Sequence, residues 1–552
     1  MISTQAAFFM HQYTAGMPLG TVDLVTVVIY LAVTLAVGFW AGSKRGKDTK
    51  GYFMADKRLP WYVIGTSMVA ADLGAQHFIA QVGAAYARGI VIAAFGWNAW
   101  IVYAFLIWIF LPYYMRSNLY TMPEFLERRF NPACRNLFAV FLAVGYVASL
   151  IGGSIYAGAL ILQSIFGVSI LASILLLGVA TGVYTVYGGL NSAAWTDFLQ
   201  MAILMTCGLL VPILALHKVG GIVHLVTTTP TKFYFFHPPT DPLFPTTGVF
   251  TAFLTIGIWY SCTSQHMVQR CLAAKDEWNA RTGIVFAGFL HIVMPLLFVI
   301  PGIIAYHMMP KLTRPDLAYL ALLDELIPPG VRGLVLAAMA AAMMSTLATV
   351  LNSSATVLTL DLYRRMWKPD ATDAEQVRFG RWNGAVTLAV GMYIAYYFSQ
   401  VKGWFLFVLV QNIFAYLAPP FAVVFTLGIL WRRANGKAAL ATILLGLPFG
   451  LFLEFWLFPG VAWLHPYDSY LHRAFFNWVF CMAVMISISL ATAPPPREKT
   501  EGIIWRPEYS VLPPEEKAKH RGWQDFRFWY LALVAVALCF YGFLFWFQFI
   551  RH

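Results

Sequence analysis

Residues 66–83 read TSMVAADLGAQHFIAQVG and interrupt a long apolar run with polar side chains. Asp72, Gln76 and His77 stand here beside Gly74, at positions where a helix surrounded by lipid normally carries no ionisable group. Polar, irregular backbone at membrane depth is tolerated only where it is buried in protein or lines a water-filled cavity. The stretch therefore predicts a break in a membrane helix that forms one wall of a solute and ion site.

The composition of the whole chain is that of an integral membrane protein. Of its 552 residues, 60% are hydrophobic and 11% are charged, whereas a soluble domain carries about 25% charged residues. The apolar runs have the length of membrane helices and lack the short alternation of barrel strands. We therefore expect an all-α integral membrane protein.

Fourteen apolar segments are long enough to cross a bilayer. They cover approximately residues 23–41, 61–85, 90–113, 133–163, 169–186, 192–216, 246–269, 283–308, 332–363, 382–399, 403–431, 438–459, 473–491 and 528–548. With the N-terminus outside, 28 of the 37 Lys and Arg residues fall on the inner side and nine on the outer side. This alternation predicts a multi-pass protein of the cell (inner) membrane with both termini extracytoplasmic and no basic residue at membrane depth.

Charge and cysteine usage exclude other classes of protein. The net charge of +12 is scattered over inner loops, so we expect contact with membrane lipid and not with nucleic acid. The six cysteines lack metal-ligand spacing, and we expect them to be reduced and structural. The first 43 residues contain no Lys or Arg, so we expect no cleavable signal peptide.

Few ionisable residues remain at predicted membrane depth. They are Asp72 and His77 in the second segment, Asp197 in the sixth and His291 in the eighth, with Glu454 near an interfacial helix end. Each costs roughly 2.5–3.5 kcal/mol to insert, so each needs a partner or a ligand. Helix-end amides and His77 could satisfy Asp72 without a ligand, and His291 could be a packing histidine.

Hydroxyl side chains gather in the ninth segment. Residues 345, 352 and 353 are seven or eight positions apart and share one helical face. Small hydroxyl residues commonly pack membrane helices together. Facing a broken helix, they can instead coordinate Na⁺ with its freed carbonyls. Spacing alone leaves both interpretations open.

Several motifs resemble one transporter family, the solute:sodium symporters, and in particular its sodium/glucose cotransporter branch. The matching segments are 52–55 (YFMA), 59–61 (LPW), 70–78 (AADLGAQHF), 187–190 (YGGL), 195–197 (WTD), 259–260 (WY), 269–275 (QRCLAAK), 344–347 (MSTL), 351–353 (LNS) and 416–420 (YLAPP). They are ordered and spaced over roughly residues 50–435.

The resemblance implies a LeuT-type fold, a five-plus-five inverted repeat with extra flanking helices. The implied parts are an N-terminal segment with the first flanking helix (1–60), repeat one (61–216), an outer loop (217–245), repeat two (246–432) and additional helices (433–552) with a cytoplasmic linker at about 492–526. One broken helix is expected in each repeat, at 70–75 and near 257–262. Such breaks agree with the requirement that irregular backbone at membrane depth line a cavity.

The resemblance also implies a sodium site. Its members would be the backbone carbonyls of Ala70, Leu73 and Ala342 and the hydroxyls of Ser345 and Thr346. Asp197 matches an aspartate near the sodium path that some members use for a second ion. An all-oxygen ligand set of this kind suits a hard cation such as Na⁺.

The implied substrate pocket follows the family only in part. His77, Asn98, Tyr260 and Gln411 match positions that touch sugar or close the inner gate. Asp72, however, replaces a usual Asn, Gly96 a Glu, Ser261 a Trp and His291 a Lys. A carboxylate only accepts hydrogen bonds, so Asp72 suits a solute with hydroxyls or an amine.

The expected function is transport, with Na⁺ as the coupling ion. We expect a secondary active symporter that imports a small polar solute, most simply a sugar or polyol, by alternating access. An amine-bearing or other non-sugar nutrient is the alternative solute, and a transporter-like sensor is a further alternative. An enzyme is not expected, because the sequence has no HExxH motif, no nucleophile elbow and no soluble catalytic domain.

Overall fold

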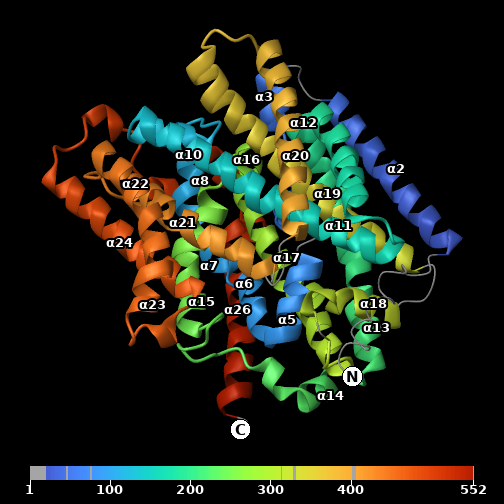
Figure 1. Ribbon diagram of the computed structural model, residues 1–552. Helices are drawn as coiled ribbons and strands as arrows, with labels where there is room; N and C mark the ends of the chain where they lie inside the picture. The colour runs from blue at the N-terminus through green and yellow to red at the C-terminus, as the bar shows by residue number, and fades with distance from the viewer. Residues whose placement is uncertain are drawn as a thin grey trace.

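The computed structural model describes residues 20–44, 48–74, 77–312, 314–326, 331–400 and 406–550, which form helices joined by loops (Figure 1). Within these ranges there is no β-strand, only an isolated bridge between Leu59 and Ala274. Nine helical stretches of the described chain are long and apolar enough to cross a membrane. The prediction of an all-α membrane protein is therefore confirmed, while the number of fourteen spans stays a prediction.

The first part of the chain runs to residue 228. Its helices are α2 (Thr21–Ser43), α3 (Thr49–Met54), η1 (Ala55–Lys57), α4 (Trp61–Asp72), η2 (His77–Gln81), α5 (Val82–Arg88), η3 (Gly89–Ala93), α6 (Ala94–Trp97), α7 (Ala99–Phe105), η4 (Leu106–Phe110), α8 (Leu111–Arg116), α9 (Met122–Arg129), α10 (Pro132–Gly145), η5 (Tyr146–Ile151), α11 (Gly152–Phe166), α12 (Ile170–Gly208), α13 (Leu210–Lys218) and α14 (Gly221–Thr228).

The second part of the chain follows residue 228 and ends with the C-terminal helices. It contains η6 (Pro230–Phe233), α15 (Thr246–Ala252), η7 (Phe253–Thr263), α16 (Gln265–Leu272), α17 (Glu277–Met308), η8 (Pro315–Leu317), α18 (Ala318–Leu326), α19 (Val331–Val357), η9 (Leu358–Trp367), α20 (Asp373–Gln400), α21 (Leu406–Leu430), α22 (Gly436–Phe452), η10 (Leu453–Leu457), α23 (Phe458–Gly460), η11 (His465–Tyr467), α24 (Tyr470–Ala491), η12 (Arg497–Lys499), η13 (Pro507–Ser510), α25 (Pro514–Lys519), η14 (Gly522–Gln524) and α26 (Phe526–Phe549).

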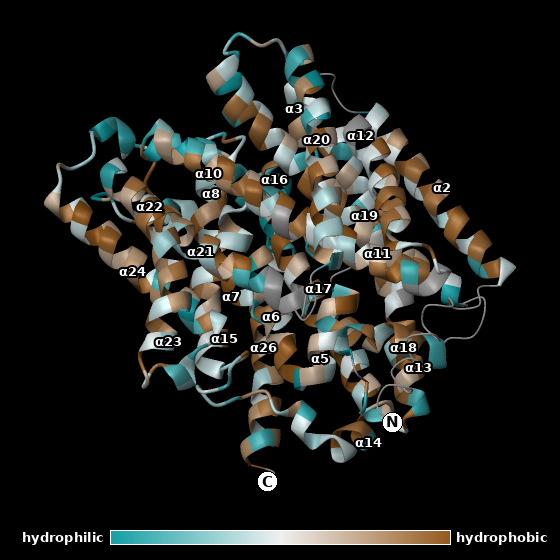
Figure 2. Cartoon of the chain, viewed as in Figure 1, coloured by the Kyte–Doolittle hydropathy of each residue, from teal (hydrophilic) through white to brown (hydrophobic). Residues whose placement is uncertain are grey.

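Packing follows the hydropathy of the helices. Helices α2 and α24 lie at the edges of the molecule and carry mainly apolar residues along their length (Figure 2). Helix α12 packs against α19 and α2, and α4 packs against α17. Only 22% of the apolar window of α2 is buried, against 88% for the stretch that contains α19. The peripheral helices therefore expose an apolar surface suited to lipid, and α19 lies in the interior.

The helix break predicted in the opening stretch begins at the end of α4. Asp72 is its last residue, and Leu73 leaves the helical conformation with φ −82° and ψ 85°. The next described element, η2, begins at His77. Ala75 and Gln76, which the sequence places inside the break, lie outside the described residues.

A second irregular stretch lies near residues 257–262, where the resemblance implies one. Residues 253–263 form wide, π-type turns, and Ser264 is extended (φ −75°, ψ 135°) before α16 begins. The backbone therefore leaves the helix just after the expected position. The boundaries of the two inverted repeats stay a prediction.

Helix α12 joins two segments that the sequence analysis treats as separate spans. The chain changes direction inside it at Gly189, which has φ 64° and ψ −158°. A side chain there would be strained, and its Cβ would lie 2.5 Å from the carbonyl oxygen of Tyr52. Glycine therefore permits both the kink and the close approach of the N-terminal segment.

The segment 492–526, expected to be a simple linker, is tied to the ends of other helices. The Trp505 backbone N–H donates to the Ile429 carbonyl at 2.9 Å, and its indole N–H donates to the Trp108 carbonyl at 2.9 Å. Arg281 donates to the carbonyls of Tyr509 (2.7 Å) and Ser510 (2.9 Å). These contacts make the segment an ordered strap.

Candidate functional site

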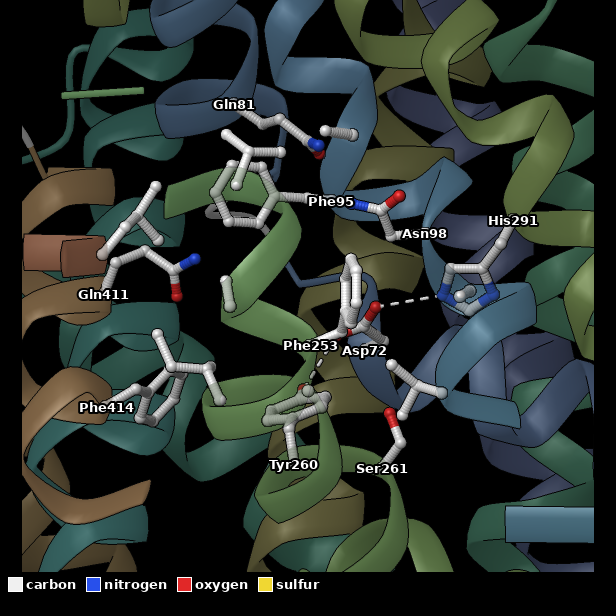
Figure 3. A pocket seen from close by; sticks show the side chains of 18 of the residues that line it. Asp72, Gln81, Phe95, Asn98, Phe253, Tyr260, Ser261, His291, Gln411 and Phe414 are labelled. Atoms are coloured by element: carbon white, nitrogen blue, oxygen red, sulfur yellow. Dashed lines mark hydrogen bonds and ion pairs between the residues drawn. The ribbon is translucent and has the colours of Figure 1, made fainter. Parts of the chain in front are cut away.

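A cavity lies between the broken helices and is lined by all six residues predicted to contact the solute. Its wall includes Asp72, His77, Asn98, Tyr260, His291 and Gln411, with Gln81, Phe95, Tyr103, Phe253, Ser261 and Phe414. Several of these side chains point into the same space in Figure 3, although they come from elements far apart in the sequence. The fold therefore brings together what the sequence shows only as separate motifs.

Asp72 is the acidic group of this cavity and has two side-chain partners. Its Oδ1 accepts from the Tyr260 hydroxyl at 2.8 Å, and its Oδ2 lies 3.3 Å from Nε2 of His291 (Figure 3). The side chain remains 26% exposed. A carboxylate has about four acceptor sites, so Asp72 retains capacity for further donors.

His291 has oxygen atoms on both sides of its ring. Nδ1 lies 2.9 Å from the carbonyl oxygen of Ala287 and 3.4 Å from the Tyr103 hydroxyl, while Nε2 faces Asp72. A carbonyl and a carboxylate only accept, so a ring that donates from both nitrogens satisfies both contacts. In that state the Asp72–His291 pair carries no net charge.

His77 is held by the broken segment itself. Its Nδ1 accepts from the Gly74 backbone N–H at 3.2 Å, and its ring lies 5.7 Å from that of Phe298. With Nδ1 accepting, Nε2 carries the proton in the neutral ring. Among the described residues no hydrogen bond joins the side chains of His77 and Asp72, whereas the ligand-free interpretation has His77 help to satisfy the carboxylate.

Three amide side chains complete the polar lining. Oδ1 of Asn98 accepts from the Tyr541 hydroxyl at 2.6 Å. Gln81 and Gln411 also line the cavity, and neither side chain hydrogen-bonds to another residue in the described part of the chain. Amides without protein partners at a cavity wall are available to a solute or to water.

Two family substitutions occupy different places. Ser261 lines the cavity, whereas Gly96 packs against α17, where an added Cβ would lie 3.0 Å from the His291 carbonyl oxygen. A larger residue at Gly96 would therefore require α17 to shift. The close packing of α6 against α17 therefore disfavours an acidic side chain at this position.

The predicted sodium ligands cluster beside the break. The Ser345 hydroxyl oxygen lies 2.9 Å from the Ala70 carbonyl oxygen. A Cβ at Gly74 would lie 3.2 Å from the hydroxyl oxygens of both Thr346 and Ser154, and these two buried oxygens have no partner among the described residues. Leu73 is the residue after α4, and Ala342 lies one turn before Thr346 in α19. An unsatisfied pair of hydroxyl oxygens at the break suits a cation.

Asp197 lies next to this cluster and is fully buried. Its Oδ1 accepts from Ser345 at 2.5 Å, and its Oδ2 accepts from Ser67 at 2.6 Å and from Arg270 at 3.0 Å. Arg270 has no exposed surface, and it also donates to Ser67, Thr349 and the His266 carbonyl. Arg270, which the charge count places on the inner side, is therefore buried in the helix bundle beside Asp197. The absence of basic residues at membrane depth stays a prediction.

Arg270 and Ser154 are the main residues that the sequence analysis missed. Arg270 was assigned to an inner loop because charge counting cannot separate a loop arginine from one folded inward on a short helix. A signal for it was present, because a buried Asp197 without a basic partner is costly. Ser154 gave no such signal, since serine is common in membrane helices.

The sequence is similar to those of known sodium-coupled transporters. Residues 52–446 match the family profile described as "SSF: Sodium:solute symporter family". The sodium/glucose cotransporter of Vibrio parahaemolyticus is 32% identical over 508 residues, which cover 86% of this chain and 91% of that protein. Sodium/myo-inositol cotransporter 2 of Oryctolagus cuniculus is 32% identical over 532 residues, covering 88% and 78% of the two chains.

Solved structures support the fold. A Na⁺-coupled sialic acid symporter in a substrate-bound outward-open state aligns with a TM-score of 0.76 at 21% identity, covering 86% of this chain and 98% of that one. Mhp1, a nucleobase-cation-symport-1 family transporter, aligns with a TM-score of 0.54 at 15% identity, covering 83% and 98%. These likenesses confirm the LeuT-type fold class. On the extent of the sequence match, the chain belongs to the sodium:solute symporter family.

Proposed function

We propose that this protein is a sodium-coupled symporter that imports a neutral sugar or polyol by alternating access. The observation that carries the proposal is the position of the break after α4. The same few residues border the hydroxyl cluster of Ser345 and Thr346 and, through Asp72 and His77, the wall of the cavity. A change of conformation at this break would alter both sites together, which is what coupling requires.

The proposed sodium site uses the carbonyl oxygens of the break and the hydroxyls of α19. Ala70, Leu73 and Ala342 would supply backbone oxygens, and Ser345 and Thr346 would supply side-chain oxygens. The Thr346 hydroxyl has no hydrogen-bond partner among the described residues, which supports this assignment, because a buried hydroxyl without a ligand is costly. Asp197 already accepts from Ser345, Ser67 and Arg270, so little of its acceptor capacity remains for a second ion.

The solute chemistry follows from the hydrogen-bonding groups of the cavity. Asp72 offers acceptor sites, while His77 and the amides of Asn98 and Gln411 offer donors. A His291 ring that donates from both nitrogens would balance the charge of Asp72, and the cavity would then not require a cationic solute. Alternating donors and acceptors match a molecule with several hydroxyl groups, each of which can both donate and accept.

The solutes after which the relatives are named support the same class. They include sodium cotransporters of glucose, myo-inositol and mannose, each about 31–32% identical to this chain. We infer that the solute is one of this class, with Asp72, His77, Asn98, Tyr260, His291 and Gln411 as its contacts.

An amine-bearing nutrient is the second candidate solute. It is favoured by the exposed part of the Asp72 carboxylate, which would attract an ammonium group if His291 were neutral. The two candidate solutes, a neutral polyol and an amine, require different net charges on the Asp72–His291 pair. Inhibition of sugar uptake by neutral polyols but not by matched amino sugars would support the first candidate.

Tyr260 is proposed as the inner cover of the solute. Its hydroxyl binds Asp72, and its ring lies 5.0 Å from that of His266 and 5.9 Å from that of Phe414. These contacts join elements of both halves of the chain beside the cavity. Release of the Tyr260–Asp72 hydrogen bond would open a path for the solute.

The proposed setting is the cell (inner) membrane, with both termini outside. The distribution of Lys and Arg supports this orientation. Labelling of single cysteines introduced at Gly502 in the strap and at Gly460 in the loop after α23 would test it, because the two should react from opposite sides.

The central experiment is uptake into proteoliposomes with an inward Na⁺ gradient. Glucose, mannose, myo-inositol and an amino sugar would be compared, with K⁺ replacing Na⁺ as the control. We expect sodium-stimulated uptake of at least one neutral sugar or polyol. Uptake of the amine alone would support the second candidate, and binding without transport of any solute would support a sensor.

A further inference from the structure

Helix α26 lies outside the part of the chain that matches the family profile, yet it reaches the cavity wall. The profile ends at residue 446, and α26 covers Phe526–Phe549. It lies along α7 and α17. The Tyr541 hydroxyl donates to Oδ1 of Asn98 at 2.6 Å, and Asn98 lines the cavity. A C-terminal flanking helix therefore holds a side chain of the proposed solute site.

The hydrogen bond determines which way the Asn98 amide faces. A tyrosine hydroxyl has one proton, and among the described residues Asn98 is the acceptor with which Tyr541 forms a side-chain hydrogen bond. If the amide turned by 180°, its NH₂ group would face the hydroxyl and that proton would lose its acceptor. Figure 3 shows the amide nitrogen directed toward Phe95, with the oxygen on the other side.

The surroundings of Tyr541 fix its position. Trp97, the neighbour of Asn98, stacks on Phe540 with ring centroids 5.2 Å apart and meets Tyr541 edge-on at 6.2 Å. Near the end of α26, Oε1 of Gln548 accepts from the backbone N–H groups of Phe235 and Phe236. The helix is thus anchored on both sides of Tyr541, and its hydroxyl can act as a fixed donor.

We propose that Tyr541 is a positioning residue that determines solute specificity by holding the Asn98 NH₂ group toward the cavity. This proposal rests on the proposed function and refines it. At Asn98 the solute must present a hydrogen-bond acceptor, such as a hydroxyl, ring or carbonyl oxygen. At Asp72 it must present a donor. The site then selects for the order of these groups along the solute as well as for their number.

The test compares two conservative variants of the same helix. Tyr541→Phe removes the hydroxyl that binds Asn98. Tyr530→Phe is the matched control, because its hydroxyl donates to the carbonyl of Trp100 at 2.9 Å, and Trp100 is not among the described residues that line the cavity. Uptake would be measured with the solute of the glucose, mannose and myo-inositol panel that wild type takes up with the lowest KM. The Na⁺ concentration for half-maximal uptake and the thermal unfolding midpoint would be measured for each variant.

We expect Tyr541→Phe to raise the KM for the solute about 3- to 10-fold, the loss expected when one hydrogen bond is weakened. The maximal rate and the Na⁺ dependence should stay at wild-type levels, and Tyr530→Phe should leave all three quantities unchanged. In an Asn98→Ala background, Tyr541→Phe should add no further change in KM, because its effect acts through Asn98. Deoxy analogues should also be discriminated less strongly by Tyr541→Phe than by wild type.

Three results would overturn the proposal. They are an unchanged KM in Tyr541→Phe, an equal rise in Tyr530→Phe, and an effect of Tyr541→Phe that persists in the Asn98→Ala background. If Tyr541→Phe unfolds, Tyr541→Trp, whose indole N–H can donate, provides the second variant and should keep a near-wild-type KM. Failure of wild type to take up any member of the panel would overturn the proposed function and this inference with it. Wild-type uptake with additive effects would overturn the inference alone.

Discussion

The hydroxyl of Ser345, a proposed sodium ligand, donates its proton to the buried carboxylate of Asp197 at 2.5 Å. The same hydroxyl also lies 2.9 Å from the Ala70 carbonyl at the helix break. A hydroxyl can coordinate a cation through the lone pairs of its oxygen while it donates its proton in a hydrogen bond to a carboxylate. The contact therefore connects the proposed sodium site to the Asp197–Arg270 pair.

Thr346 provides the sharpest test of the sodium site, because its buried hydroxyl has no partner in the described chain. Thr346→Val keeps the shape but removes the oxygen, and we expect the Na⁺ concentration for half-maximal uptake to rise roughly 5- to 100-fold, equivalent to about 1–3 kcal/mol. Ser345→Ala should act in the same direction. Uptake measured against Na⁺ concentration checks this.

Thr346→Ser is the matched control, since it keeps the hydroxyl and removes only a methyl group. Its Na⁺ activation should stay close to that of wild type. Solute binding without Na⁺ should change little in any of these variants. If Thr346→Val activates like Thr346→Ser, then Thr346 is a packing residue and not a sodium ligand.

Much of this arrangement could be predicted from sequence. The break after α4 was visible because Asp72, Gly74 and His77 stand inside an apolar run. The hydroxyls of α19 were visible from helical spacing, although spacing alone could not separate packing from ion binding. Short-range patterns of this kind depend only on the period of the helix, which a sequence displays directly.

Contacts between distant segments were not accessible in this way. Asp72 and His291 are 219 positions apart, and nothing in either segment shows that their side chains meet. Tyr541 lies in a mainly apolar helix whose sequence indicates a simple membrane span, so its contact with Asn98 depends on how α26 packs. Arg270 was misplaced because its position depends on where the second broken helix turns, and boundaries are the least reliable part of a sequence interpretation.

Tyr260 contributes a hydrogen bond and aromatic cover, and two variants separate these contributions. Tyr260→Phe removes only the bond to Asp72, so we expect a rise in KM of about 3- to 10-fold with a similar maximal rate. Tyr260→Ala also removes the ring and should lower the maximal rate. Initial rates of uptake over a range of solute concentrations give both quantities. Equal behaviour of the two variants would show that the ring provides no cover.

Asp316, in the loop after α17, should make stability depend on pH. Burial raises the pKa of its carboxyl to about 7 from an ordinary value of 3.8. The pKa of Asp316 is higher in the folded state than in the unfolded state, so the protonated carboxyl contributes to the free energy of unfolding. This contribution is complete below about pH 4 and is lost as the pH rises through about 7. Between pH 6 and pH 8 the loss is about 1 kcal/mol.

The thermal unfolding midpoint at pH 6 and pH 8 checks this prediction. Asp316→Asn cannot ionise, so the difference between its midpoints should be smaller than that of wild type. Asp324→Asn is a suitable control, because its carboxylate is 39% exposed in the helix that follows Asp316. An identical pH response in all three proteins would mean that Asp316 stays ionised in the folded state.

The buried pair of Asp197 and Arg270 should behave as one unit in stability. Removal of a single partner leaves a charge without compensation, and such changes cost about 3–5 kcal/mol. Asp197→Asn and Arg270→Met should therefore each lower the unfolding midpoint strongly. The double variant removes both charges, so it should be less destabilised than the sum of the single variants.

Sodium dependence then separates structure from transport in this pair. Arg270→Met removes a donor from Oδ2 of Asp197, the oxygen that also accepts from Ser67. Asp197→Asn in addition weakens the acceptor that orients the Ser345 hydroxyl, which is Oδ1. We expect Asp197→Asn to raise the Na⁺ concentration for half-maximal uptake more than Arg270→Met does, in samples matched for folded protein. Equal effects on Na⁺ activation would assign the pair a structural role only, because the Ser345 contact distinguishes the two residues.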